Sequence, residues 1–305
     1  MQLPMVFPDG EEYNDRPFLF THMSRERNWG QMKVIDAHVH LYPDKIAGKV
    51  TASLGAKFGN APSFVATVEG CRSRDASAGV ALSINLPVAT APGQVPHTNA
   101  WAHAVNESER AHPSGPSVLS LASLHPDCVD KSALVAQIAA AGFSGIKFHP
   151  EYQQFRFNDP KMEEIWAAMA ECGLVAYLHA GGERVFKPPY HSTPREIADL
   201  QRRFPSLAIV AAHLGGFGMW DESEAVLCGS TVNLDLSHTF GWMDEAQILR
   251  MIRKHGANRI LFGTDAPWQD PGTVLQAFLR LPLTQEEQGD ILAGNAMRLF
   301  RIASI

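Results

Sequence analysis

Short apolar runs alternate with longer amphipathic segments from residue 33 to the end of the chain. Runs rich in Val, Ile and Leu that end at Gly or Pro are typical of buried strands, and parallel strands covered on both faces read this way. Eight such runs are predicted as strands, at residues 33–40, 79–87, 117–126, 143–150, 173–182, 207–216, 230–238 and 259–267.

The segments between these runs carry helix signals, clearest at residues 130–143, 159–174, 192–205 and 243–257. The second of them opens with Asp159 as the expected N-cap and Pro160 at the first helical position, and it stops at Gly173. Eight strand–helix units predict one α/β domain, a (β/α)₈ TIM barrel, for which about 250 residues is typical. A doubly wound open sheet is the rival, but the glycine-rich phosphate turn usual after its first strand is missing.

Composition and length fit this class of protein. The 305 residues are 45 % hydrophobic and 19 % charged, as in ordinary soluble globular proteins. Residues 1–32 are irregular and are predicted to form an N-terminal extension to a barrel at residues 33–305. Such an extension is compatible with a homodimer. The extension lacks the apolar segment of a signal peptide, and no stretch approaches about 18 consecutive apolar residues. We therefore expect a soluble, cytoplasmic protein.

Charge and cysteine usage exclude several other classes. The net charge of −6 argues against nucleic-acid and membrane partners, which need clustered Lys and Arg, and leaves a small molecule as the expected partner. The four cysteines lie more than 40 residues apart and form no CxxC pair. Reduced thiols are therefore expected, rather than a thiolate zinc site.

Histidines and one aspartate stand at the ends of the predicted strands. Residues 33–40 end in His38 and His40, the later runs reach His179 and His213, and the last run contains Asp265. Side chains alternate along a strand, so His38 and His40 share one face, about 7 Å apart along the chain. The carboxyl ends of barrel strands hold the active sites of TIM-barrel enzymes, so these side chains should converge there.

A pair of imidazoles on one strand face can chelate one metal ion. His179 and Asp265 complete a set of three nitrogens and one oxygen, which suits Zn²⁺ or another borderline divalent ion. His213 is then placed to orient or deprotonate the metal-bound water. A single histidine at a strand end is more often structural, so the prediction depends on the joint occurrence of all these residues.

Four motifs carry a family resemblance: "DAHVH", "YLHAGG", "AAHLGG" and "LFGTDAPW". Over roughly residues 33–303 the chain resembles the amidohydrolase superfamily, closest to the branch of aminocarboxymuconate-semialdehyde decarboxylase and the dicarboxylate lactonases. The resemblance implies that His38, His40 and His179 bind a divalent metal. It further implies that Asp265 is both ligand and proton shuttle, and that His213 stands over the water or substrate.

Lys147 and His149 stand two residues apart in the motif "GIKFHP". In binuclear members of the superfamily a lysine of the fourth strand is carboxylated and bridges two metals, and Lys147 matches that role in part. The favoured interpretation is an inward lysine paired with Asp36 or another carboxylate. One Zn²⁺ is therefore expected, and two if Lys147 is carboxylated.

Further residues are predicted as substrate contacts, each with a plain structural alternative. His149 and Lys147 belong to the fourth strand, Glu151 follows them, and Trp268 follows Asp265 as an apolar wall. Arg195 ends a long loop whose cationic groups would suit a carboxylate, although it also fits the first turn of a helix. His125 and His238 end two more strands and either line the pocket or cap a helix.

These residues predict an enzyme. The favoured function is a metal-dependent hydrolase, in which Asp265 and His213 act on a metal-activated water that cleaves an amide, lactone or ester bond of a small carboxylated molecule. The alternative is a non-oxidative, metal-dependent decarboxylase with the same ligands. A non-catalytic metal-binding barrel comes third, because it would require a missing ligand and all five positions are filled.

Overall fold

The computed structural model describes residues 33–111 and 115–305. The predicted extension, residues 1–32, lies outside the described residues, so its role stays a prediction. The strands are β1 (Ile35–Val39), β2 (Leu82–Asn85), β3 (Ser117–Ser120), β4 (Ala122–Ser123), β5 (Gly145–Phe148), β6 (Val175–Leu178), β7 (Ile209–Ala211), β8 (Asn233–Asp235) and β9 (Ile260–Leu261).

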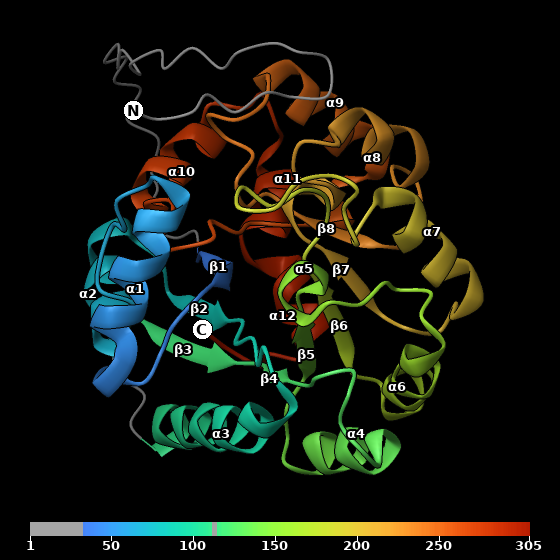
Figure 1. Ribbon diagram of the computed structural model, residues 1–305. Helices are drawn as coiled ribbons and strands as arrows, with labels where there is room; N and C mark the ends of the chain where they lie inside the picture. The colour runs from blue at the N-terminus through green and yellow to red at the C-terminus, as the bar shows by residue number, and fades with distance from the viewer. Residues whose placement is uncertain (1–32, 112–114) are drawn as a thin grey trace. The chain divides into compact units, whose positions relative to one another are not determined.

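Helices follow the strands along the chain and surround them (Figure 1). They are α1 (Asp44–Phe58), α2 (Val68–Ala78), α3 (Val95–Ala111), α4 (Lys131–Ala140), α5 (Pro150–Gln153), α6 (Pro160–Cys172), α7 (Pro194–Arg203), α8 (Trp220–Val226), α9 (Glu245–His255), α10 (Pro271–Leu279), α11 (Gln285–Gly289) and α12 (Asn295–Phe300).

The strands form the predicted parallel (β/α)₈ barrel. They pair in the orders β1-β2-β3 and β4-β5-β6-β7-β8-β9, and every pair is parallel. Backbone hydrogen bonds from β1 to the segment after β9 close the ring, including Asp265 N to His38 O at 2.8 Å and His40 N to Ala266 O at 2.7 Å. This seam brings the first and last predicted ligands together.

One predicted strand, residues 117–126, is divided into β3 and β4 at Leu121. β3 pairs with β2 and β4 pairs with β5, so the chain changes partner inside the run. Asn106 on α3 holds the break, because its side chain accepts from Ser120 N and donates to Ser120 O. The two pieces together occupy one position of the barrel.

The predicted start and end of α6 are confirmed, with Asp159 at the N-cap position. Gly173 follows the helix with φ of 63°, a left-handed conformation that glycine adopts without steric cost. Pro160 is the first helical residue, as expected. Asp159 makes no capping hydrogen bond, because its side chain accepts from Arg156 N at 2.9 Å instead.

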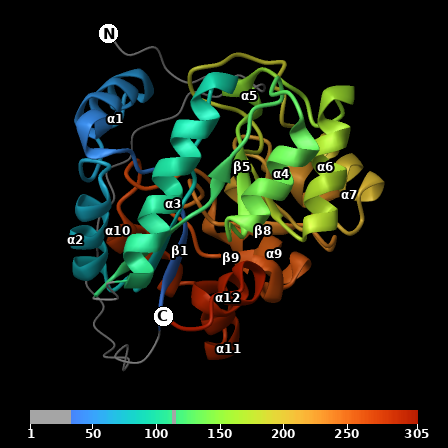
Figure 2. The same cartoon turned by 90° about the horizontal axis from the view of Figure 1, so that it is seen from below.

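The two ends of the barrel are covered differently. Figure 2 shows α5 at one end of the strands, and α11 and α12 at the other. Phe300 of α12 belongs to the same buried cluster as Ile35, Tyr177 and Leu261 from three strands. The end covered by α11 and α12 is therefore filled by apolar packing, and the end near α5 is available for a site.

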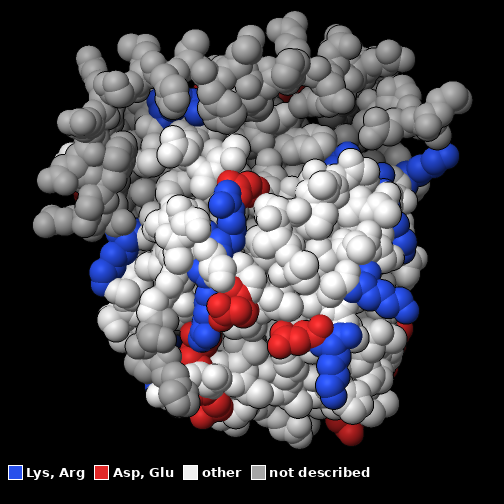
Figure 3. Space-filling model, turned by 90° about the vertical axis from the view of Figure 1, so that its left-hand side faces the viewer, with Lys and Arg blue, Asp and Glu red and all other residues white. Residues whose placement is uncertain are grey.

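Charged side chains alternate in sign over the face that Figure 3 presents. On α2, Arg72 pairs with Glu109 and Arg74 pairs with Asp270. In the described residues no helix combines the length and the apolar character that a bilayer span requires.

The buried carboxyl group of Asp75 predicts how the stability of the folded state changes with pH. It is 1 % exposed, and its Oδ2 accepts from Ser83 Oγ at 2.8 Å and from Cys71 Sγ at 3.3 Å. Burial raises the pKa of Asp75 from 3.8 to about 6. The folded state therefore holds this proton more tightly than the unfolded state does, and the stability from this group is lost as pH rises from about 4 through about 6.

Asp75→Asn mimics the protonated acid and should raise the free energy of unfolding at pH 8, by up to about 3 kcal/mol. Urea unfolding of both proteins at pH 5 and pH 8 measures this. The gain should be clearly smaller at pH 5, where the wild-type carboxyl is already largely protonated. A variant that is equally destabilised at both pH values would show that burial of this charge is not what limits stability.

Candidate metal centre and active site

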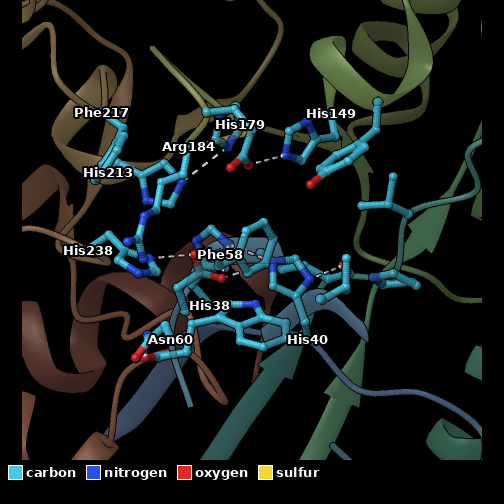
Figure 4. A pocket seen from close by; sticks show the side chains of 18 of the residues that line it. His38, His40, Phe58, Asn60, His149, His179, Arg184, His213, Phe217 and His238 are labelled. Atoms are coloured by element: carbon cyan, nitrogen blue, oxygen red, sulfur yellow. Dashed lines mark hydrogen bonds and ion pairs between the residues drawn. The ribbon is translucent and has the colours of Figure 1, made fainter. Parts of the chain in front are cut away.

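A cavity of about 240 Å³ opens at the carboxyl ends of the strands. Figure 4 shows that its histidines come from several strands and point toward one another. The cavity wall includes the predicted His38, His40, His149, His179, His213, Asp265 and Trp268. The strand-end histidines therefore meet in one place, as the alternation of the strands predicted.

His38, His40 and Asp265 make the tightest cluster. His38 Nε2 lies 3.2 Å from His40 Nε2, and Asp265 Oδ1 lies 3.5 Å and 3.1 Å from these two atoms. The other ring nitrogens fix the protons: His40 Nδ1 donates to the Leu86 carbonyl at 2.9 Å, and His38 Nδ1 donates to Asp235 Oδ2 at 2.8 Å. Both Nε2 atoms then carry lone pairs toward the carboxylate.

Three acceptors that face one another need a cation between them. Asp265 Oδ1 is buried and receives no hydrogen bond from the described residues, which is costly for a carboxylate oxygen. His38, His213 and Asp265 also form a group whose ligand atoms lie within 4.8 Å of one another. The donor set of imidazole nitrogens and one carboxylate fits a divalent metal ion.

The backbone at this end of the barrel is strained at the residues of the site. His213, His238 and Asp265 have φ of 59°, 49° and 64°, in the left-handed region that residues with a Cβ adopt at a cost. Such strain often accompanies functional sites, where the surrounding structure holds it in place.

Asp235 supports two of the histidines from inside the barrel, and the sequence analysis missed it. Its Oδ2 accepts from His38 Nδ1 and, at 2.6 Å, from Tyr177 OH. Its Oδ1 accepts from the backbone N–H groups of His213 and Ser237, each at 2.9 Å. Burial opposes ionisation, but His38 and these hydrogen bonds hold the pKa of Asp235 well below its usual range. A carboxylate of this kind orients a metal-binding imidazole.

His179 and His213 form a second pair of facing nitrogens. His179 Nε2 donates to Gly182 O at 3.0 Å, which leaves Nδ1 unprotonated, 3.2 Å from His213 Nε2. His213 Nδ1 contacts the Ser237 carbonyl at 3.2 Å. His179 therefore faces His213 rather than the pair on β1. The predicted ligand role of His179 stays a prediction.

Lys147 lies under the cluster, fully buried, with Nζ 3.4 Å from His38 Nε2 and 5.1 Å from the centre of the Tyr177 ring. Burial lowers the pKa of Lys147 to about 8. The expected inward position is confirmed, but the described residues form no ion pair of Lys147 with Asp36 or another carboxylate, and Asp36 accepts from Thr264 and from His38 N instead. Lys147 supplies positive charge beside the acceptors.

His149 lies in the cavity wall opposite His38 and His40 (Figure 4). Its ring stacks on His179 with centroids 4.0 Å apart, and its Nε2 lies 3.4 Å from Glu183 Oε2. The hydroxyl of Tyr152, which also lines the cavity, is buried without a hydrogen-bond partner among the described residues. His149 and Tyr152 therefore offer polar atoms near the cavity.

Two residues predicted to contact substrate lie elsewhere. Glu151 is 1 % exposed and binds His191 through a 2.8 Å contact with Nδ1, so it anchors the loop after β6. The side chain of Arg195 is 75 % exposed and pairs with Glu222 at 3.2 Å. The cation that the long loop brings to the cavity is Arg184.

His238 resolves the alternative that the sequence left open. It lines the cavity, and its Nδ1 lies 2.7 Å from Asp265 Oδ2. Gly181 lets the loop pass close by, because its φ is 85° and a Cβ there would lie 2.2 Å from Phe217 N. The alternation "NLDLSH" could have indicated Asp235 and Ser237, which share one strand face.

A closed parallel barrel with converging imidazoles and a carboxylate at its carboxyl end defines a metal-dependent TIM-barrel enzyme class. The chain belongs to the Amidohydrolase family, whose profile matches residues 35–302. No curated protein matches the chain. The expected superfamily is thereby confirmed, whereas the choice between hydrolase and decarboxylase is not.

Solved structures of similar fold include three that are informative. An uncharacterised TIM-barrel protein from Bordetella bronchiseptica has a TM-score of 0.70 at 18 % identity, covering 88 % of this chain and 99 % of its own. A 5-carboxyvanillate decarboxylase mutant from Novosphingobium aromaticivorans, with bound manganese, has a TM-score of 0.68 at 14 % identity. The match covers 90 % of this chain and 99 % of the decarboxylase chain. A probable 2-pyrone-4,6-dicarboxylic acid hydrolase from Acinetobacter baumannii has a TM-score of 0.62 at 16 % identity. The match covers 89 % of this chain and 100 % of the hydrolase chain.

Proposed function

We propose that this protein is a metal-dependent, non-oxidative decarboxylase of small cyclic carboxylic acids. This reverses the order favoured by the sequence, in which hydrolysis came first. Most of the functionally named enzymes among the similar folds are decarboxylases of aromatic acids, and this supports the reversal.

The observation that carries the proposal is the contrast between the two parts of the cavity. His38, His40 and Asp265 gather at the metal-binding cluster, whereas much of the remaining wall is apolar: Leu41, Val50, Leu54, Phe58, Leu86, Val88, Phe217 and Trp268. Loss of CO₂ removes the charge of the carboxylate at the reacting carbon, so an apolar wall around that carbon favours this step over one that requires water. The volume suits a molecule with a single ring.

In this reaction the bond between the ring carbon and its carboxylate breaks, the electron pair stays on the carbon, and the carbon takes a proton. A divalent ion would withdraw charge from the bound acid. His238 Nδ1 lies within hydrogen-bond distance of Asp265 Oδ2, 2.7 Å away, at the side of the cluster. We assign proton delivery to this pair, and the binding of the acid to the side of the cluster that His213 faces.

We propose one ion per chain, held by His38, His40 and Asp265 with His179 or His213 completing the set. The imidazole and carboxylate donors suit Mn²⁺ as well as the Zn²⁺ that the sequence suggested. The bound manganese of the similar decarboxylases supports testing Mn²⁺ first.

Hydrolysis of a lactone or amide remains the second candidate, because of Lys147. Its lowered pKa, about 8, increases the neutral amine that reacts with CO₂ to form a carbamate. A carbamate there would lie beside His38, with the facing nitrogens of His179 and His213 available for a second ion. This arrangement would suit attack by water.

The two candidates differ in their products. Mn²⁺-loaded protein is incubated with 5-carboxyvanillate, 2,6-dihydroxybenzoate and 2-pyrone-4,6-dicarboxylate, and CO₂ is measured alongside loss of substrate. We expect one CO₂ per benzoate consumed and, in D₂O, one deuterium at the carbon that lost it. Asp265→Asn is the control and should release none. Ring opening of the pyrone without CO₂ would replace the proposal by the hydrolase.

A further inference from the structure

Arg184 is a cation of the cavity wall for which the described residues provide no ion pair. Among the described residues that line the cavity it is the sole Lys or Arg, and no carboxylate of the described residues forms an ion pair with it. Arg156 and Arg203, by contrast, pair with Glu196 and Glu163. A half-buried guanidinium that faces a cavity and pairs with no carboxylate of the described residues is a site for an anion.

The guanidinium is held in place by an aromatic ring. Its central carbon lies 4.9 Å from the centre of the Trp242 ring, within the range of a cation–π contact. Trp242 in turn contacts Phe217 and His238, with ring centroids 5.5 Å and 5.9 Å apart. Both of these residues line the cavity with Arg184 (Figure 4), so the cation is fixed on the His238 side.

The neighbouring acid acts on this cation through its charge but forms no ion pair with it among the described residues. Glu183 directly precedes Arg184 but turns toward His149, 3.4 Å away. Lys187, on the same loop, is exposed and does not line the cavity. The wall therefore has a negative side at Glu183 and a positive side at Arg184, and an anionic group of a bound molecule is directed to the latter.

We propose that Arg184, supported by Trp242, binds a second anionic group of the substrate, so that the preferred substrates are ring dicarboxylates rather than monocarboxylates. The inference rests on the proposed function, in which the metal-binding cluster takes the first carboxylate. A guanidinium binds a carboxylate through two parallel hydrogen bonds, and its fixed position reduces the entropy lost on binding.

The test is a comparison of two inert probes, isophthalate and benzoate, by titration calorimetry with the Mn²⁺-loaded protein. Wild type should bind isophthalate about 10- to 100-fold more tightly than benzoate, because charge-assisted hydrogen bonds contribute on this scale. Arg184→Gln should abolish the preference with the metal content unchanged. Arg184→Lys should keep part of it, since the charge remains but the two-pronged geometry is lost.

Arg203→Gln is the matched control, because Arg203 also lies over an aromatic ring, 5.5 Å from the centre of Phe204, but pairs with Glu163 on the outside of the barrel. It should keep the wild-type preference. Because the readout is binding, the test separates the Arg184 subsite from the proposed decarboxylase function. Loss of the preference for isophthalate in Arg184→Gln supports the subsite whether or not CO₂ is released. An unchanged preference in that variant would overturn it.

Discussion

Replacing His40 with alanine is expected to remove the bound divalent ion and to lower turnover by about three orders of magnitude or more. His40 Nε2 lies 3.1 Å from Asp265 Oδ1 and 3.2 Å from His38 Nε2, so its loss opens one side of the cluster. Catalysis that depends on the ion should fail with it. Mn²⁺ affinity and CO₂ release of both proteins measure the effect.

His40 is a better position for this test than His38. The second nitrogen of His40 binds only the Leu86 carbonyl, whereas His38 also satisfies the buried carboxylate of Asp235. His40→Ala should therefore keep the fold, and circular dichroism with thermal unfolding provides the control. A folded variant that binds Mn²⁺ as tightly as wild type would exclude His40 as a ligand.

Asp235→Asn is expected to have the second largest effect, weakening Mn²⁺ binding about 10- to 100-fold. The change removes the negative charge of the carboxylate that holds the Nδ1 proton of His38. The NH₂ group of the new side chain would face groups that are themselves hydrogen-bond donors. Chelator competition on the folded protein measures the affinity. Because Asp235 does not itself face the cavity, the loss should reach activity through metal occupancy and be partly restored by excess Mn²⁺.

Tyr177→Phe is the matched control for Asp235→Asn. It removes the hydrogen bond from Tyr177 OH to Asp235 Oδ2 and leaves the carboxylate and its contact with His38 in place. The affinity for Mn²⁺ should change by a few fold at most. Equal losses in both variants would mean that Asp235 acts through general stability rather than by orienting His38.

The barrel and the convergence of its histidines were predictable, because both depend on local patterns. Strand alternation put His38 and His40 on one face, and the parallel order of the strands put His179, His213 and Asp265 at the same end. The division of residues 117–126 was not predictable, since it depends on Asn106 from a neighbouring helix.

Residues whose role depends on the path of a loop or on long-range packing were less accessible. Arg184 lies in the loop after β6 and Arg195 in the first turn of α7, and nothing local distinguishes the one that lines the cavity from the one that pairs with Glu222. Asp235 is the acid of a short buried strand, and its partner His38 is 197 positions away in sequence. Only the closed barrel brings them together.

The metal content of the protein decides whether the cluster of His38, His40 and Asp265 is a metal site. Full-length protein is purified without chelators, and ions per chain are counted by plasma mass spectrometry. We expect about one divalent ion per chain, restored after removal by adding Mn²⁺ or Zn²⁺. No ion in the purified protein, and none taken up from either metal, would contradict it.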